Sequence, residues 1–125
     1  MANPNIVNVT SIYGKTTGLT LTTSYQDIVT NAQNSGKILK INTLIINNID
    51  GTNAASVTGQ IVTTSVVFVG YLANTISVPA DSSLVLISKD TSIYLEENMK
   101  IRLLASAGSD LSATISYEEI SWDGF

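Results

Sequence analysis

The sequence contains no cysteine and no histidine. The absence of cysteine excludes disulfide bonds. Without either residue, the commonest general base, the commonest nucleophile and most transition-metal ligands are missing. We therefore expect a protein that is not an enzyme and that has no catalytic residue, no cofactor and no metal site.

Charged residues are also scarce, at 13% of the chain, which is about half the usual share. No cluster of Lys or Arg occurs, so the electrostatic footprint of a nucleic-acid-binding protein is absent. The longest apolar stretch, Val66 to Ala73, is interrupted by Gly70 and is far shorter than the roughly 20 residues that span a bilayer. The N-terminus lacks the basic segment and apolar run of a secretory signal. We expect a soluble protein that binds neither nucleic acid nor membrane.

The surface must be covered largely by Ser, Thr and Asn, which are abundant. Neutral hydroxyl and amide groups can be buried in a contact between proteins without desolvating an ion. Such a surface suits dense packing against other subunits, and we expect the free protein to be a stable oligomer. The composition fits equally well with a β-protein that has a Thr-rich outer face.

Val, Ile and Thr are plentiful, and these β-branched residues favour strands. From Leu111 to Tyr117 the odd positions are apolar and the even positions are polar, as in a half-buried antiparallel strand. A weaker alternation covers Val57 to Ile61. The long, mostly apolar segment Lys37 to Ile49 is typical of a central strand covered on both faces. It ends in a turn cluster in which Asp50-Gly51 is suited to positive φ angles.

Further strands are expected at Leu19–Thr23, Tyr25–Val29, Val66–Leu72, Thr75–Val78, Leu84–Ser88, Thr91–Leu95 and Lys100–Ala105. About eight to ten short strands with regular turns indicate an all-β fold, an antiparallel β-sandwich that resembles a jelly roll. We find no linker and no internal repeat, so residues 1–125 are expected to form a single domain.

The two ends of the chain are candidate contact segments. Residues 1–18 form either a docking arm, which would join a partner by strand addition, or the first strand of the sandwich. Residues 121–125 are expected to form a C-terminal tail whose two large aromatic side chains dock either on the core of the same protomer or on a neighbour. Together they supply the candidate partner interface: Ile6, Val7, Val9, Ile12, Tyr13, Trp122 and Phe125.

The charge distribution suggests an orientation for such an interface. Lys15 is the only charged residue in 1–18, whereas eight of the ten acidic residues follow residue 62. Burying the near-neutral segment against a partner costs less than burying ions. We therefore expect a near-neutral end that faces the partner and an acidic end that faces water.

No constellation of residues supports catalysis. Ser88 and Lys89 are adjacent, and the carboxylate pairs Glu96-Glu97 and Glu118-Glu119 are consecutive. Neighbours in a strand point to opposite faces, so none of these pairs is expected to share a site. The segment Asp50 to Asn53 lacks the alternating acids and the terminal Glu of a calcium loop.

Three stretches resemble a family of small virion structural proteins of tailed bacteriophages that infect marine bacteria and cyanobacteria. They are the opening MANPNIVNVTSIYGK (1–15), the central VPADSSLVLISKDTSIYLEE (78–97) and the closing DLSATISYEEIS (110–121). The resemblance covers nearly the whole chain. It lies in the residue pattern and in short stretches of sequence, with no catalytic residues among them. It implies a component of a phage virion that is assembled in the host cytoplasm.

Within such a particle, the resemblance and composition together favour a capsid decoration (cement) protein. Such a protein would bind the major capsid protein on the head surface and stabilise the head, as a homo-oligomer such as a trimer at symmetry axes. A subunit of the neck, tail, baseplate or fibre fits the same residues. A receptor- or glycan-binding role at a fibre tip is disfavoured because the loops are short.

Overall fold

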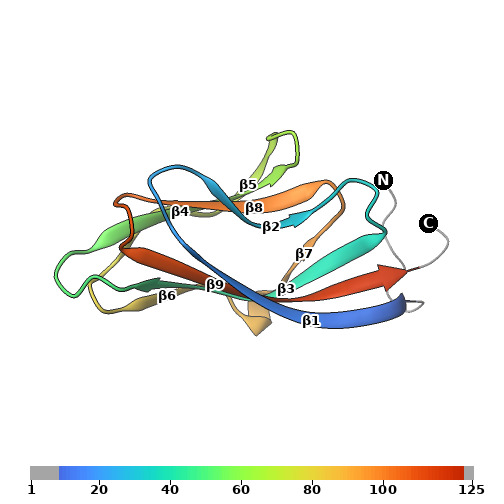
Figure 1. The fold of residues 1–125 in the computed structure, drawn as a ribbon, viewed down its shortest axis with the longest axis horizontal. Helices are drawn as coiled ribbons and strands as arrows, with labels where there is room; N and C mark the ends of the chain where they lie inside the picture. The colour runs from blue at the N-terminus through green and yellow to red at the C-terminus, as the bar shows by residue number, and fades with distance from the viewer. Residues whose placement is uncertain (1–8, 123–125) are drawn as a thin grey trace.

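In the computed structural model, which describes residues 9–122, the chain forms two stacked antiparallel sheets (Figure 1). The elements, in chain order, are β1 (Val9–Thr20), β2 (Gln26–Asn31), β3 (Lys37–Asn48), β4 (Ala55–Thr63), β5 (Phe68–Val78), β6 (Ser83–Ile87), the 3-10 turn η1 (Lys89–Thr91), β7 (Ile93–Leu95), β8 (Met99–Ala105) and β9 (Leu111–Trp122). The expected all-β sandwich is confirmed.

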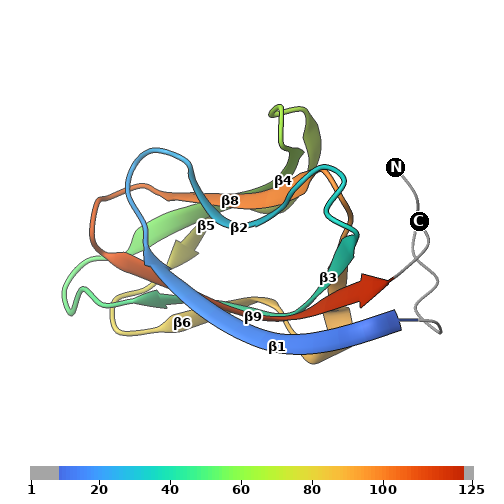
Figure 2. The same ribbon diagram turned by 45° about the vertical axis from the view of Figure 1, so that its right-hand side comes forward.

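The strand order is that of a jelly roll. Sheet A has the order β1-β9-β3-β6, with β7 also pairing with β3, and sheet B has the order β2-β8-β4-β5. Each sheet therefore draws its strands from both halves of the chain, as two interlocked Greek keys require. Figure 2 shows the two layers from a second angle, with β1 at the margin of sheet A.

The core lies between the sheets and is built by period-2 alternation. In β9, Leu111, Ala113 and Ile115 are at most 1% exposed, and Tyr117 packs partly buried against the same cluster. The predicted inward face of this strand is confirmed. Val57 of β4 is likewise fully buried in this cluster. Leu, Ile and Val side chains from both sheets close the space without a disulfide.

Two buried asparagines connect the sheets at opposite ends of β3. Asn31 of β2 donates from Nδ2 to the carbonyl oxygens of Lys37 (2.9 Å) and Leu95 (3.0 Å) in sheet A. Asn48, the last residue of β3, donates from Nδ2 to the carbonyl oxygen of Val78 in β5 (2.9 Å). Each buried amide thus donates to backbone carbonyl groups of the other sheet, and so its own polar groups are satisfied in the interior.

Some predicted boundaries are wrong. β1 runs unbroken from Val9 to Thr20, so Leu19–Thr23 is not a separate strand. Gly14 and Gly18 lie within this strand and have no positive φ angle. β5 is likewise continuous over Phe68–Val78. β9 extends to Trp122, so the expected tail at 121–125 begins inside a strand.

The positive φ angles predicted at Asp50-Gly51 are also absent: neither residue is among the described positions with positive φ. The Asp50 carboxylate closes this turn instead, because Oδ1 accepts a hydrogen bond from the Thr52 amide at 2.8 Å. That hydrogen bond holds the pKa of Asp50 below its ordinary value. A left-handed residue does occur at Asn98 (φ 66°), in the turn after Glu96-Glu97, and Asn tolerates this conformation.

The expected separation into a neutral end and an acidic end is wrong. β1 pairs along its length with β9, which places Tyr13 opposite Glu119 and Gly14 opposite Glu118. Strands from the two halves of the sequence are neighbours in both sheets, so a charge difference along the sequence does not become a difference between two ends of the molecule.

Replacing Ile115 by Ala should lower the free energy of unfolding by about 2–5 kcal/mol, because it leaves a cavity in the centre of the core. The neighbouring Ser116→Ala change, on the opposite face of β9, should cost less than about 1 kcal/mol. Urea denaturation of both variants measures the difference. Equal midpoints would contradict the strand register.

Candidate functional site

Within 9–122 no group of three or more Asp or Glu side chains is placed to hold a metal ion. No helix in this range has the length and hydropathy to cross a membrane. The distinctive features of this part of the chain are its exposed apolar side chains and its strand edges.

The two acidic pairs have structural contacts. Glu97 is buried and accepts a hydrogen bond from the Gly36 amide at 2.8 Å, which ties the β7–β8 turn to the β2–β3 turn. Glu119 accepts from Lys37 (2.8 Å) and Lys15 (3.0 Å), and so joins three neighbouring strands. One member of each pair, Glu97 or Glu119, thus has a structural contact.

The ion pairs shift two pKa values. The pKa of Glu119 lies below its ordinary 4.5, mainly because Lys37 donates a hydrogen bond to the carboxylate, with Lys15 adding to the effect. The pKa of Lys15 is raised, mainly by its hydrogen bond to Glu119. The cluster thus stabilises the charged forms of Glu119 and Lys15.

The most prominent surface feature is an exposed apolar hairpin. Five side chains at the β4–β5 connection and the start of β5, each 47–60% exposed, make up this apolar hairpin: Val66, Val67, Phe68, Val69 and Tyr71. The rings of Phe68 and Tyr71 lie 5.0 Å apart at 60°, a tilted contact that such rings favour. Contiguous exposed apolar side chains of this size mark an interaction surface.

No charged residue occurs between Asp50 and Asp81, so β4, the apolar hairpin and β5 are all neutral. Solvent-facing edge strands are usually guarded by Lys or Glu, which prevent association with other strands. β5 lacks such residues, although it lies at the edge of sheet B. This neutral edge can be buried without desolvating an ion.

β5 is nevertheless protected against strand pairing by its shape. Its register with β4 shifts at three places, between Val57 and Gly59, between Gly59 and Gln60, and between Ile61 and Val62, and β5 holds one extra residue at each. Such bulges bend a strand and interrupt its hydrogen-bonding edge. The hairpin rises from sheet B on the side away from sheet A in both ribbon views (Figures 1 and 2).

The tip of the hairpin carries backbone strain. Val66 has φ 67°, in the left-handed region that a β-branched residue adopts only at a cost. Its amide donates to the Thr63 carbonyl at 2.8 Å, which closes the turn. Gly or Asn would adopt this conformation more easily. Strain retained at one exposed apolar residue is evidence for a functional surface.

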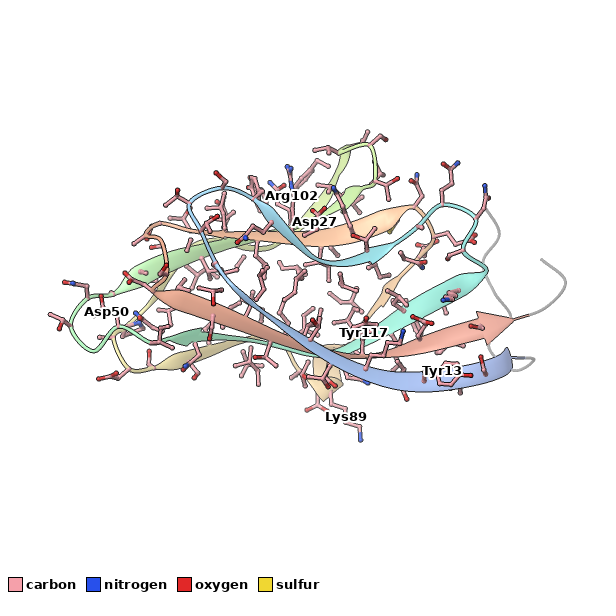
Figure 3. The ribbon with its side chains drawn as sticks, viewed as in Figure 1. Tyr13, Asp27, Asp50, Lys89, Arg102 and Tyr117 are labelled. Carbon is pink, nitrogen blue, oxygen red and sulfur yellow. The ribbon has the colours of Figure 1, made fainter. Side chains whose placement is uncertain are left out.

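Beside the hairpin, the outer face of sheet B carries paired cations. Arg102 donates from Nε and Nη2 to the Gln60 amide oxygen (3.0 and 2.9 Å), and its guanidinium lies 4.0 Å from the centre of the Tyr25 ring. Lys100 pairs with Asp27 at 3.1 Å. Figure 3 shows Arg102 and Asp27 on this outer side. Because these groups already have partners, the face is polar but is not a free basic patch.

The interface residues expected from the sequence are only partly described. Ile12 and Tyr13 lie on β1 and are 55% and 58% exposed. Val9 pairs through its backbone with Trp122. Three candidates lie outside the described residues: Ile6, Val7 and Phe125.

Sequence reasoning missed the apolar hairpin. From sequence, the run Val66 to Ala73 is too short to span a membrane and predicts a strand, with no sign that its side chains are exposed. The available signal was the combination of this apolar run with the absence of charge from Gly51 to Ala80.

The two layers and their strand order define the class of fold, a jelly-roll sandwich. No protein-family model matches the sequence, and no curated protein matches it.

Two solved structures are similar in fold. A chain from Bacillus endospore appendages, described as a novel family of disulfide-linked pili, has a TM-score of 0.56 at 14% identity over 98% of both chains. A chain from infectious bursal disease virus, Gx strain, has a TM-score of 0.47 at 11% identity, over 91% of this chain and 33% of the viral one. The present chain has no cysteine, so it cannot form disulfide links.

Replacing Glu119 by Gln should reduce the pH dependence of stability. Because the pKa of Glu119 is lowered in the folded protein, its contribution is complete above 4.5 and is lost as the pH falls through the folded-state pKa. Urea midpoints at neutral pH and at about pH 3 measure the loss. Glu118→Gln removes a charge from the same strand and is the control; an equal effect of both variants would contradict the assignment.

Replacing Val66 by Asn should raise the free energy of unfolding by about 1 kcal/mol, because Asn relieves the left-handed strain. Val67→Asn removes a similar exposed side chain without a positive φ, and should change stability by less than about 0.5 kcal/mol. Thermal denaturation compares the two variants. Equal melting temperatures would show that Val66 is not strained.

Proposed function

We propose that this protein is a non-enzymatic structural subunit of a bacteriophage virion, and most specifically a decoration protein of the head. The proposal rests on the sequence resemblance to phage virion proteins and on the exposed apolar hairpin. The hairpin is the main structural support for the proposal, because its exposed, uncharged apolar side chains favour contact with a partner protein. A jelly roll by itself hosts many functions and does not select one.

The hairpin has the composition of a docking element. Phe68 and Tyr71 offer large apolar areas, and aromatic residues are enriched at the centres of interfaces. The surrounding strands carry no charge between Asp50 and Asp81, so burial leaves no ion without water or a partner. The strained Val66 at the tip keeps an apolar side chain where Asn or Gly would fold more easily.

We propose that the major capsid protein, another virion protein, covers this surface. The hairpin would bind in an apolar and uncharged depression on the outer face of the capsid protein. The chain carries a net charge of −4, and its charges lie outside the hairpin. On this assignment the charged remainder of the molecule stays in water while the neutral hairpin is buried. Assembled copies would form a homo-oligomer on the head, and a trimer remains the expectation for symmetry axes.

A subunit of the neck, tail or baseplate is the second candidate, since the same hairpin would serve there. A glycan-binding role has less support. The three exposed tyrosines, Tyr13, Tyr71 and Tyr94, lie on β1, β5 and β7, which are not neighbouring strands. They form no shared aromatic platform of the kind that would bind a sugar.

Counting copies in purified phage particles by mass analysis and imaging tests the proposal. Decoration of the head requires copies on the order of hundreds, whereas a neck or tail ring requires on the order of a dozen. Absence from the particle would end the virion proposal.

Particles stripped of the protein then test the surface. Phe68→Glu should weaken rebinding at least tenfold, because it places a charge in the buried contact. Val85→Glu alters a residue of similar exposure on sheet A (56% against 53%) and should rebind like the wild type. Equal rebinding of both variants would move the contact away from the hairpin.

A further inference from the structure

The outer edge of β1 is the one strand edge among the described residues that lacks a device against pairing. A sandwich leaves open edges, here β1 and β6 with β7 in sheet A, and β2 and β5 in sheet B. Natural proteins blunt such edges with bulges, charges or short strands. The four edges of this protein differ sharply in this respect.

Three of the edges are blunted. β5 has three register shifts. β2 has only six residues, includes the charged Asp27 and has a register shift of its own. β6 and β7 have five and three residues and are separated by η1, which carries Lys89 and Asp90.

β1 has none of these protections over most of its length. It has twelve residues, and from Ser11 to Thr20 it pairs with β9 without a register shift. Its only charged residue is Lys15, whose ammonium is paired with Glu119 at 3.0 Å on its own sheet. The opposite side of β1 therefore presents a long, regular row of backbone donors and acceptors.

The side chains near the start of β1 have no explanation within one copy. Ile12 and Tyr13 are 55% and 58% exposed. A Cβ at Gly14 would meet nothing within 4 Å, and Gly14 does not have a positive φ. Neither packing nor backbone conformation requires glycine there. Glycine in a strand often marks the close approach of another backbone.

We propose that β1 pairs with β1 of a second copy, antiparallel, about a two-fold axis at Tyr13. In this register Tyr13 lies opposite Tyr13 of the second copy. Ile12 lies opposite Gly14 of the second copy, on the outer face of sheet A. The side chain of Ile12 then covers the space that Gly14 leaves open. Sheet A continues across both copies, so the exposed edge disappears.

Charge and symmetry select a second copy as the occupant. A strand edge is self-complementary about a two-fold axis, and such a contact closes at a dimer. The proposed register places Lys15 opposite Ser11 of the partner, so the two lysines do not face one another. Each Lys15 also keeps its own Glu119. The inference is independent of the proposed function, because it concerns the purified protein alone.

Cysteine cross-linking tests both the interface and its register, since the chain has no native cysteine. Opposed residues on antiparallel strands have Cα atoms about 4.5–5.5 Å apart, within the range of a disulfide. Tyr13→Cys should therefore give a disulfide-linked dimer under mild oxidation. Thr17→Cys, on the same face of β1, and Ile76→Cys, on the β5 edge, are matched single-cysteine controls.

Cross-linking at Tyr13 that exceeds both controls at least tenfold, together with a wild-type mass of twice 13.3 kDa by light scattering, supports the proposal. A wild-type mass near 13.3 kDa at high micromolar concentration overturns it. Cross-linking that is equal at all three positions, or strongest at Thr17 or Ile76, overturns it as well. Because no particle is involved, failure here leaves the virion role to its own test.

Discussion

The amide bridges of Asn31 and Asn48 hold the sandwich closed at both ends, and the rest of the structure depends on that closure. Each buried side chain satisfies carbonyl groups of the opposite sheet. The chain has no disulfide to perform this task. Removing either amide would remove the direct hydrogen bonds from that side chain to the opposite sheet, each of which contributes about 0.5–1.5 kcal/mol. The Asn48 bridge also ties Val78, the last residue of β5, to sheet A, and so fixes the base of the strand that carries the hairpin.

The parts of the fold that depend on local pattern were predictable from the sequence. The inward face of β9 follows from strict alternation between Leu111 and Tyr117, and most strands were placed near their true positions. The roles of buried polar residues were not predictable, because their partners are remote: Asn31 binds the carbonyl of Leu95, 64 residues away. The extent of β1 was not predictable either, because the sequence places a boundary between residues 18 and 19, where the strand in fact continues to Thr20.

The candidate surfaces were predictable only in part, for a related reason. Ile12 and Tyr13 stand out as apolar residues near the start of the chain. The apolar hairpin does not, because its exposure follows from how the β4–β5 connection projects from sheet B, which only the tertiary structure shows (Figure 1). A run such as Val66 to Val69 is typical of a buried strand until tertiary structure turns it outward. The positive φ angle of Val66 supports the same interpretation, because selection for stability alone would favour Gly or Asn at that position.

The bulges of β5 protect an edge by shape, and this has a consequence for the solvent that the protein can tolerate. Lysine and glutamate at an edge act through electrostatic repulsion, which is screened over about 3 Å at 1 M salt. A bent, interrupted backbone is unaffected by ions. Salt also strengthens apolar contacts when its ions are excluded from the protein surface. At high salt concentration the bulges of β5 would still prevent strand pairing, and burial of the neutral hairpin would be favoured. The bulged edge and the uncharged hairpin therefore both work in a solvent where charged edge residues lose their effect.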